Sequence, residues 1–172
     1  MERLEDAKVL VAELMDDEAI AALSAACAVD VKYKLSREEI LAVIPEYDGL
    51  IVRSETTVDK TLLEAATKLR IVGRAGSGLD NIDVPSATQR GVVVCNTPES
   101  NVVSAAEHTM GLLLATSRNI PWADRFLKSG QWGRKQFEGS ELYGKTLGII
   151  GLGRIGGLVS QRAQGFAMHV IA

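Results

Sequence analysis

Residues 145–172 read KTLGIIGLGRIGGLVSQRAQGFAMHVIA, in which an apolar run over residues 147–150 leads into a glycine-rich turn and then a helical pattern. The order strand, GxGxxG turn and helix is typical of dinucleotide-binding units, although glycine-rich turns also serve packing alone. Gly151 suits the tight turn, Gly153 leaves the backbone open to a pyrophosphate, and Gly156 allows helix and strand to pack closely. The free N–H groups at the start of the helix favour phosphate binding. We therefore predict a dinucleotide site at this turn.

The choice between NAD and NADP depends on the residue that binds the ribose. In dinucleotide-binding units an acidic residue about 20 positions after the glycines accepts hydrogen bonds from the ribose hydroxyls. That position lies just past Ala172. The sequence therefore leaves the choice open.

Composition limits the class of protein. The chain has 172 residues, 47% of them hydrophobic, which allows one good core or one domain and the start of another. The net charge of -3 gives no global field that would attract nucleic acid or an anionic membrane. Apolar runs are short, and Cys27 and Cys95 lie among apolar residues without a CxxC spacing. We expect a soluble, cytoplasmic protein with two buried free thiols.

The first part of the chain alternates short apolar runs with amphipathic segments. A capping-box pattern, Ser36-x-x-Glu39, opens one of the helices. Strands are predicted at 9–12, 29–33, 49–53, 70–73 and 92–95, and helices at 17–27, 36–43, 59–67 and 84–90. This alternation predicts an α/β fold with a parallel sheet covered on both faces, and we expect the flavodoxin-like doubly wound order.

A domain boundary is predicted near Pro98, giving domains at 1–98 and 99–172. Beyond it, residues 101–118 have the length and composition of a buried helix, residues 121–129 predict a shorter one, and a charged loop follows. One strand-turn-helix with a trailing strand buries little apolar surface alone. We expect the residues after Asn101 to be disordered, displaced onto the first domain, or shared with another copy.

Three longer segments resemble the D-2-hydroxyacid dehydrogenase family. They are RAGSGLDNID at 74–83, NTPESNVVSAAEHTMGLLLATSRNIP at 96–121 and GQWGRKQFEGSELYGKTLGIIGLGRIG at 130–156. The resemblance spans essentially the whole chain. Within the family, the chain most resembles the members that act on 3-phosphoglycerate. The resemblance implies that NAD accepts a hydride from C2 of a small phosphorylated 2-hydroxy acid, on the route to serine. It also implies a homodimer or homotetramer, a flavodoxin-like substrate domain, and then the first strand-turn-helix of a Rossmann-type nucleotide domain.

Substrate-binding candidates follow the predicted strands, at the edge where open α/β sheets bind ligands. The loop Gly76-Ser77-Gly78 can form an anion nest for a carboxylate, with Gly78 at its end, and Ser77 can also approach the nicotinamide. Arg53 and Arg74 could bind a phosphate through charge-assisted hydrogen bonds, and the family pattern favours this over solvated arginines. Asn96 could contact substrate or hold a loop, and the sequence does not separate the two.

The resemblance adds candidates in the second part of the chain. Arg134 and Lys135 form a basic pair beside two aromatic residues, and the corresponding family loop lies near the dimer interface and can lend a cation to the neighbouring substrate site. The alternative is a solvated turn with its aromatics tucked into the core. Arg154 and Ile155 are implied to bring their backbone near the pyrophosphate.

No catalytic residue and no metal ligand is predicted in this chain. Hydride transfer from a hydroxy acid needs a base and a cation that orients the carboxylate. In the family an arginine, a glutamate and a histidine supply these roles, and all three follow the end of this sequence. We expect the chain to be the N-terminal portion of an enzyme and inactive alone. His108 and His169 are interpreted as packing or sheet-edge residues.

Three alternative functions remain. One is a related dehydrogenase acting on glyoxylate, lactate or another 2-hydroxy acid, which phosphate-dependent affinity would distinguish. Another is a non-catalytic protein that senses the cofactor on the same scaffold. The last is an isolated flavodoxin-like domain, which would fold over residues 1–98 and bind no cofactor.

Overall fold

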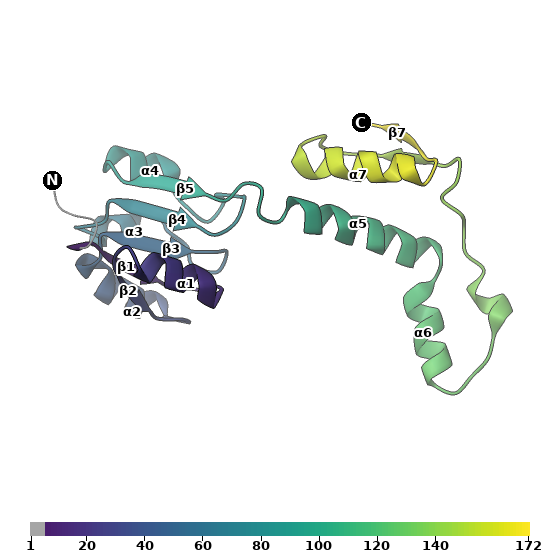
Figure 1. The fold of residues 1–172 in the computed structure, drawn as a ribbon, viewed down its shortest axis with the longest axis horizontal. Helices are drawn as coiled ribbons and strands as arrows, with labels where there is room; N and C mark the ends of the chain where they lie inside the picture. Colours follow the sequence, from purple (N-terminus) through teal and green to yellow (C-terminus); the bar gives the residue numbers. More distant parts are fainter. Residues whose placement is uncertain (1–5) are drawn as a thin grey trace. The chain divides into compact units, whose positions relative to one another are not determined.

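The computed structural model describes residues 6–172, which form two compact units, Met1–Ser100 and Asn101–Ala172 (Figure 1). The first unit contains a parallel sheet with helices between its strands, and the second contains helices and a two-stranded sheet. No helix among the described residues is long and apolar enough to cross a membrane. The assignment of substrate binding to residues 1–98 and of nucleotide binding to residues 99–172 stays a prediction.

The sheet of the first unit has five parallel strands in the order β2-β1-β3-β4-β5. Its strands are β1 (Lys8–Val11), β2 (Ala28–Val31), β3 (Gly49–Val52), β4 (Ile71–Arg74) and β5 (Val93–Asn96). This is the flavodoxin-like order, so the predicted fold class is confirmed. The order reverses between β1 and β3, which is where doubly wound sheets bind ligands beyond their carboxyl ends.

Four helices connect these strands. They are α1 (Asp17–Ser24), α2 (Arg37–Val43), extended by the 3-10 turn η2 (Ile44–Glu46), α3 (Lys60–Ala65) and α4 (Val84–Gln89). Each α-helix has an N-cap side chain that accepts a hydrogen bond from a backbone N–H of its first turn, a stabilising arrangement. The predicted capping box is present, since Ser36 and Glu39 bond reciprocally.

The two faces of this sheet are covered unequally. Right-handed crossovers place α1 on one face and α2, α3 and α4 on the other (Figure 1). Strand residues that face the three helices, such as Leu10, Leu50 and Val72, are fully buried. On the α1 face, Ile71 and Val93 keep 42% and 59% of their surface exposed. The prediction that both faces are covered is therefore wrong for β4 and β5, over which no helix from the described residues of the first unit lies on this face.

The two cysteines are also less buried than predicted. Both are free, as predicted, but Cys27 is only half-buried and Cys95 is exposed. Cys95 alternates along β5 with residues that face the three helices, so its side chain lies on the less covered face. The prediction of two buried thiols is wrong because apolar sequence neighbours do not fix which face a strand residue occupies.

The second unit is built around a strand-helix-strand segment. Its elements are α5 (Val102–Ser117), α6 (Ile120–Lys128), the 3-10 turn η3 (Arg134–Phe137), β6 (Thr146–Gly148), α7 (Arg154–Gly165) and β7 (His169–Ile171). Strands β6 and β7 pair in parallel, and α7 connects them. The predicted strand, glycine turn and helix are therefore present, with the strand ending at Gly148 rather than at residue 150.

Helix α5 packs along α7. Ala106 and Met110 of α5 are buried against Val159 of α7, and a neighbouring cluster joins Leu142, Ala163 and Met168. These clusters give the second unit an apolar core of its own, in place of the predicted disorder, while displacement onto the first domain and sharing with another copy stay predictions. The prediction of a fully buried α5 is also wrong, since within the described second unit the buried residues Val102, Ala106 and Met110 form one stripe of the helix.

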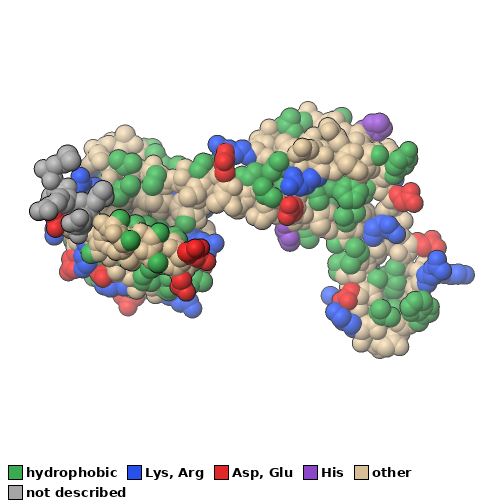
Figure 2. Space-filling view, viewed as in Figure 1, with side chains coloured by type: hydrophobic (Ala, Val, Ile, Leu, Met, Phe, Trp, Pro, Cys, Tyr) green, Lys and Arg blue, Asp and Glu red, His purple; other side chains and the backbone are tan. Residues whose placement is uncertain are grey.

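Apolar side chains remain exposed on α6 and the segment that follows it (Figure 2). Phe126 packs on Phe137 at 5.3 Å between ring centroids. Trp122 and Trp132 keep 72% and 82% of their surface exposed. The alternative in which the aromatics near Arg134 are tucked into the core is therefore wrong for Trp132, and Phe137 is only half-buried, against Phe126.

Candidate functional site

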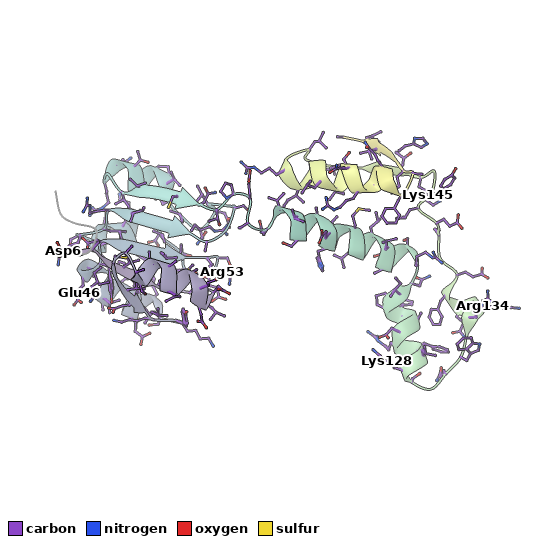
Figure 3. All side chains as sticks on the ribbon, in the orientation of Figure 1. Asp6, Glu46, Arg53, Lys128, Arg134 and Lys145 are labelled. Atoms are coloured by element: carbon purple, nitrogen blue, oxygen red, sulfur yellow. The ribbon has the colours of Figure 1, made fainter. Side chains whose placement is uncertain are left out.

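Three loops meet at the carboxyl edge of the five-stranded sheet. They follow β3, β4 and β5, and backbone hydrogen bonds join them: Ala75 N–H donates to Val52 O at 2.9 Å, and Thr97 N–H donates to Gly76 O at 3.1 Å. Arg53 lies here, at the opposite end of the sheet from Glu46 (Figure 3). The structure thus brings together the predicted substrate-binding residues of the first unit, Arg53, Arg74, Ser77, Gly78 and Asn96.

A cavity of about 660 Å³ opens at this edge. Arg53, Ala75, Thr97 and Ser100 line it together with the start of α1. Arg53 is exposed, and its Nη1 donates to Leu14 O at 3.2 Å. A guanidinium has five N–H donors, so this side chain can bind an anion in the cavity without losing that contact.

Arg74 is placed differently from Arg53. Only 12% of its side chain is exposed, its Nε donates to Arg53 O at 3.0 Å, and Nη2 lies 3.9 Å from Asp80 Oδ1. A Cβ on Gly76 would come within 2.6 Å of Arg74 Nη1, so the guanidinium lies directly against the 76–78 loop. The geometry favours a role in supporting both loops over a direct role in phosphate binding.

Asn96 supports the loop of small residues. Its Nδ2 donates to Ser77 O at 2.7 Å, which ties the end of β5 to the loop after β4. The sequence left substrate contact and loop support open for Asn96, and this bond favours loop support. Ser77 is partly buried and Gly78 is exposed at the end of the loop.

A buried carboxylate that the sequence analysis did not single out fixes the loop after β3. Glu13 keeps 7% of its surface exposed. One carboxylate oxygen accepts from the N–H groups of Arg53 and Thr56, at 2.8 and 2.9 Å, and the other from those of Ser54 and Glu55, at 3.0 and 3.1 Å.

The ionised form of Glu13 is favoured by these bonds. Burial acts to raise the pKa of Glu13, but hydrogen bonds from the backbone N–H groups outweigh it and hold the pKa below its ordinary value. The available sequence signal was position, because Glu13 lies two residues after β1, at the same edge as the predicted candidates. A second missed residue is Asn81, whose Nδ2 donates to Arg53 O and Thr56 O at 3.1 and 2.7 Å.

The glycine turn of the second unit fits a dinucleotide phosphate. Gly151 has φ +97°, which favours glycine, and a Cβ on Gly156 would lie 2.3 Å from Gly151 O. A Cβ on Gly153 would meet nothing within 4 Å, so the backbone there is open to a ligand. Arg154 and Ile155 begin α7, whose N-cap makes no side-chain hydrogen bond. A cavity of about 390 Å³ lies beside the turn.

Arg134 and Lys135 lie on η3 in the second unit, and both are exposed. Arg134 lines a cavity of about 350 Å³ with Phe126, Trp132 and Phe137. Both cations are therefore on the surface of the second unit, where they can meet a partner.

The two histidines are exposed rather than packed. His108 lies on α5, where packing against apolar neighbours was predicted, and His169 lies on the edge strand β7. The packing interpretation is therefore wrong for His108 and the sheet-edge interpretation holds for His169. Neither lies in the first unit, where the substrate candidates converge.

Comparison with known proteins gives a consistent result. Residues 9–171 match the family model described as D-isomer specific 2-hydroxyacid dehydrogenase, catalytic domain. The chain is 51% identical over 166 residues to D-3-phosphoglycerate dehydrogenase of Archaeoglobus fulgidus, covering 96% of this chain and 32% of the relative. The chain thus spans about a third of the length of that relative.

Solved structures agree with this match. A 3-phosphoglycerate dehydrogenase of Entamoeba histolytica with bound NAD⁺ superposes with a TM-score of 0.77 at 31% identity, over 96% of this chain and 53% of that one. An acyclic imino acid reductase, Bsp5, in complex with NADPH and D-Arg superposes with a TM-score of 0.83 at 28% identity, over 94% of this chain and 54% of that one.

Proposed function

The chain belongs to the D-isomer specific 2-hydroxyacid dehydrogenase family, and on that premise we propose that it is part of an NAD-dependent oxidoreductase acting on 3-phosphoglycerate. The reaction converts the C2 hydroxyl of 3-phosphoglycerate to the carbonyl of 3-phosphohydroxypyruvate. The hydroxyl proton leaves to a base, and NAD, when bound, accepts the hydride from C2. We place the enzyme in serine biosynthesis and in the cytoplasm.

One observation carries the substrate assignment. Arg53, an exposed arginine, lines a cavity at the carboxyl edge of the sheet, and the loop of small residues is hydrogen-bonded through Gly76 O to Thr97, which lines the same cavity. Arg53 would bind the phosphate through charge-assisted hydrogen bonds. The N–H groups of the Gly76-Ser77-Gly78 loop would bind the carboxylate. Arg74 and Asn96 would hold these loops in place through their bonds to Arg53 O and Ser77 O.

The cofactor would bind to the second unit. Gly151, Gly153 and Gly156 shape a turn that leaves room for a pyrophosphate, and the first N–H groups of α7, at Arg154 and Ile155, would bind its oxygens. Ser77 would lie near the nicotinamide. Relatives with NAD⁺ and with NADPH are both known in this fold, and we propose NAD because the phosphoglycerate dehydrogenase among them holds it.

We assign no catalytic residue to this chain, and we propose that it does not turn over alone. The base and the carboxylate-orienting cation would come from sequence that follows the nucleotide-binding turn in the relatives. We propose a homodimer or homotetramer for the whole enzyme, in which Arg134 or Lys135 extends toward the substrate site of a neighbouring subunit.

Phosphate-dependent binding tests the substrate assignment. We expect calorimetric titration of the chain to show at least tenfold tighter binding of 3-phosphoglycerate than of D-glycerate, which differs only by the phosphate. Arg53→Ala should remove most of that preference, because one charge-assisted pair contributes roughly 1.5–3 kcal/mol. Arg90→Ala is the matched control, since Arg90 ends α4 at the other edge of the sheet. Equal affinity for both ligands would favour a dehydrogenase for an unphosphorylated 2-hydroxy acid.

A further inference from the structure

The loop formed by Arg53, Ser54, Glu55 and Thr56, called here the 53–56 loop, has four consecutive N–H groups directed at one carboxylate. Consecutive N–H groups that converge in this way form a site for an anion. Here the anion is the Glu13 side chain, which is buried and lies two residues after the end of β1. A substrate phosphate therefore cannot use these N–H groups, and in this loop Arg53 is the one cationic side chain that can bind it.

The carbonyl side of the same loop is also fixed. Asn81 Nδ2 donates to Arg53 O and Thr56 O, and Arg74 Nε donates to Arg53 O. The backbone of the 53–56 loop is thus held on one side by a carboxylate and on the other by an amide and a guanidinium. Such a loop has few alternative conformations, so the Cα of Arg53 is fixed before any ligand binds.

The segment that follows β1 also contacts the Arg53 side chain. Glu13 accepts from the Arg53 backbone N–H at 2.8 Å, and the carbonyl of the next residue, Leu14, accepts from Arg53 Nη1 at 3.2 Å. Two adjacent residues therefore hold both ends of Arg53 beside the 660 Å³ cavity. An exposed arginine otherwise loses considerable rotamer freedom on binding, and this arrangement reduces that loss.

We propose that Glu13 is a positioning residue that fixes the 53–56 loop so that the Arg53 guanidinium is held ready for the substrate phosphate. This inference rests on the proposed function, since it assigns the phosphate to Arg53. Glu13 acts through Arg53 and does not touch the substrate itself.

Substitution by glutamine changes little in size but much in bonding. Glu13→Gln keeps one acceptor oxygen for two of the four N–H groups. Its NH₂ group is a donor and would face the other two N–H donors. At least two loop N–H groups then lose their acceptor, and the 53–56 loop has to move.

The test is the ratio of the affinities of the 172-residue chain for 3-phosphoglycerate and for D-glycerate, measured by calorimetry. Glu13→Gln should lower this ratio about tenfold. In the Arg53→Ala background, Glu13→Gln should change the ratio no further, because the two residues act on the same phosphate. Glu39→Gln is the matched control: it removes a carboxylate that also accepts a backbone N–H, at 2.7 Å from Ser36 N, but on an exposed helix start. It should leave the ratio unchanged.

Loss of the fold in Glu13→Gln is checked by circular dichroism. If that variant does not fold, Asn81→Ala, which releases the 53–56 loop from its carbonyl side, should lower the ratio in the same direction. A wild-type ratio in the folded variants would overturn the role of Glu13 while leaving the proposed function intact. A wild-type chain without preference for 3-phosphoglycerate would instead overturn the proposed function, and this inference with it.

Discussion

Two arginines at the carboxyl edge of the sheet have different environments and therefore different capacities. Arg53 is exposed beside a cavity, whereas only 12% of the Arg74 side chain is exposed and its Nε is bonded to a carbonyl. Both residues have the same side chain, and both lie at a strand end: Arg53 directly follows β3 and Arg74 is the last residue of β4. The lower exposure of Arg74 arises from the loop that follows it. Gly76 lacks a side chain, so the Arg74 guanidinium can lie against the backbone of that loop.

Stability should depend on Glu13 in a defined pH range. The pKa of Glu13 is lowered in the folded chain, so ionised Glu13 stabilises the fold above its unfolded pKa, about 4.3. That contribution is lost as the pH falls through the lower, folded pKa. Lys34, Arg37, Glu55 and Asp59 line a cavity with Glu13, so the same four charged side chains face residue 13 in both proteins.

The measurement is urea unfolding of wild type and Glu13→Gln between pH 7 and pH 3. At pH 7 we expect Glu13→Gln to be less stable by roughly 2–3 kcal/mol, because hydrogen bonds to a buried charge are lost. This difference should shrink as the pH falls below the unfolded value of about 4.3 and through the lower pKa of folded Glu13, where the wild-type side chain takes up a proton. A difference that stays constant down to pH 3 would show that the charge of Glu13 contributes nothing.

The sequence was sufficient to predict a candidate site residue where its position at the end of a strand identified it. Arg53, Arg74 and Asn96 directly end or follow strands, and the structure places all three at one edge. Glu13 lies two residues after β1 at the same edge but was missed, because a carboxylate does not suggest phosphate binding. Its role depends on four N–H groups of the 53–56 loop, some 40 residues away in the chain. Such long-range pairing leaves no local signal.

Among the elements, the strand-turn-helix formed by β6, the glycine turn and α7 has the strictest local requirements. Gly151 has a positive φ and Gly156 approaches Gly151 O too closely for a side chain. These requirements are local, so the element could be predicted from the sequence. The partner of α7 could not, because the apolar stripe of α5 that covers it is separated from the turn by α6 and η3.

Two neighbouring glycines of α7 should respond oppositely to alanine. A Cβ on Gly156 would meet Gly151 O at 2.3 Å, so Gly156→Ala should destabilise the second unit by roughly 1–3 kcal/mol. A Cβ on Gly157 would meet nothing within 4 Å, so Gly157→Ala should be neutral or stabilise α7 by up to about 1 kcal/mol. Hydrogen exchange of the α7 amides measures both. Equal protection in the two variants would contradict the close approach at Gly156.

For the chain as a whole, the alternation of strands and helices was sufficient to predict the flavodoxin-like order of the first unit. Coverage of the sheet was not predictable in the same way. Ile71 and Val93 are strand residues by pattern, yet they remain exposed because no helix from the described residues of the first unit lies over them. The family assignment follows from similarity over nearly the whole chain, which spans 32% of a 51% identical relative. The proposed reaction combines a phosphate site in the first unit with a dinucleotide site in the second.

The most direct test of this account is a titration of NADH into the 172-residue chain, followed by nicotinamide fluorescence, with Gly156→Ala as the matched variant. The account predicts a saturable change in fluorescence for wild type that Gly156→Ala loses, and a different NADH affinity when 3-phosphoglycerate is present. Wild-type fluorescence that rises only linearly with NADH, with or without 3-phosphoglycerate, would contradict a dinucleotide site in this chain.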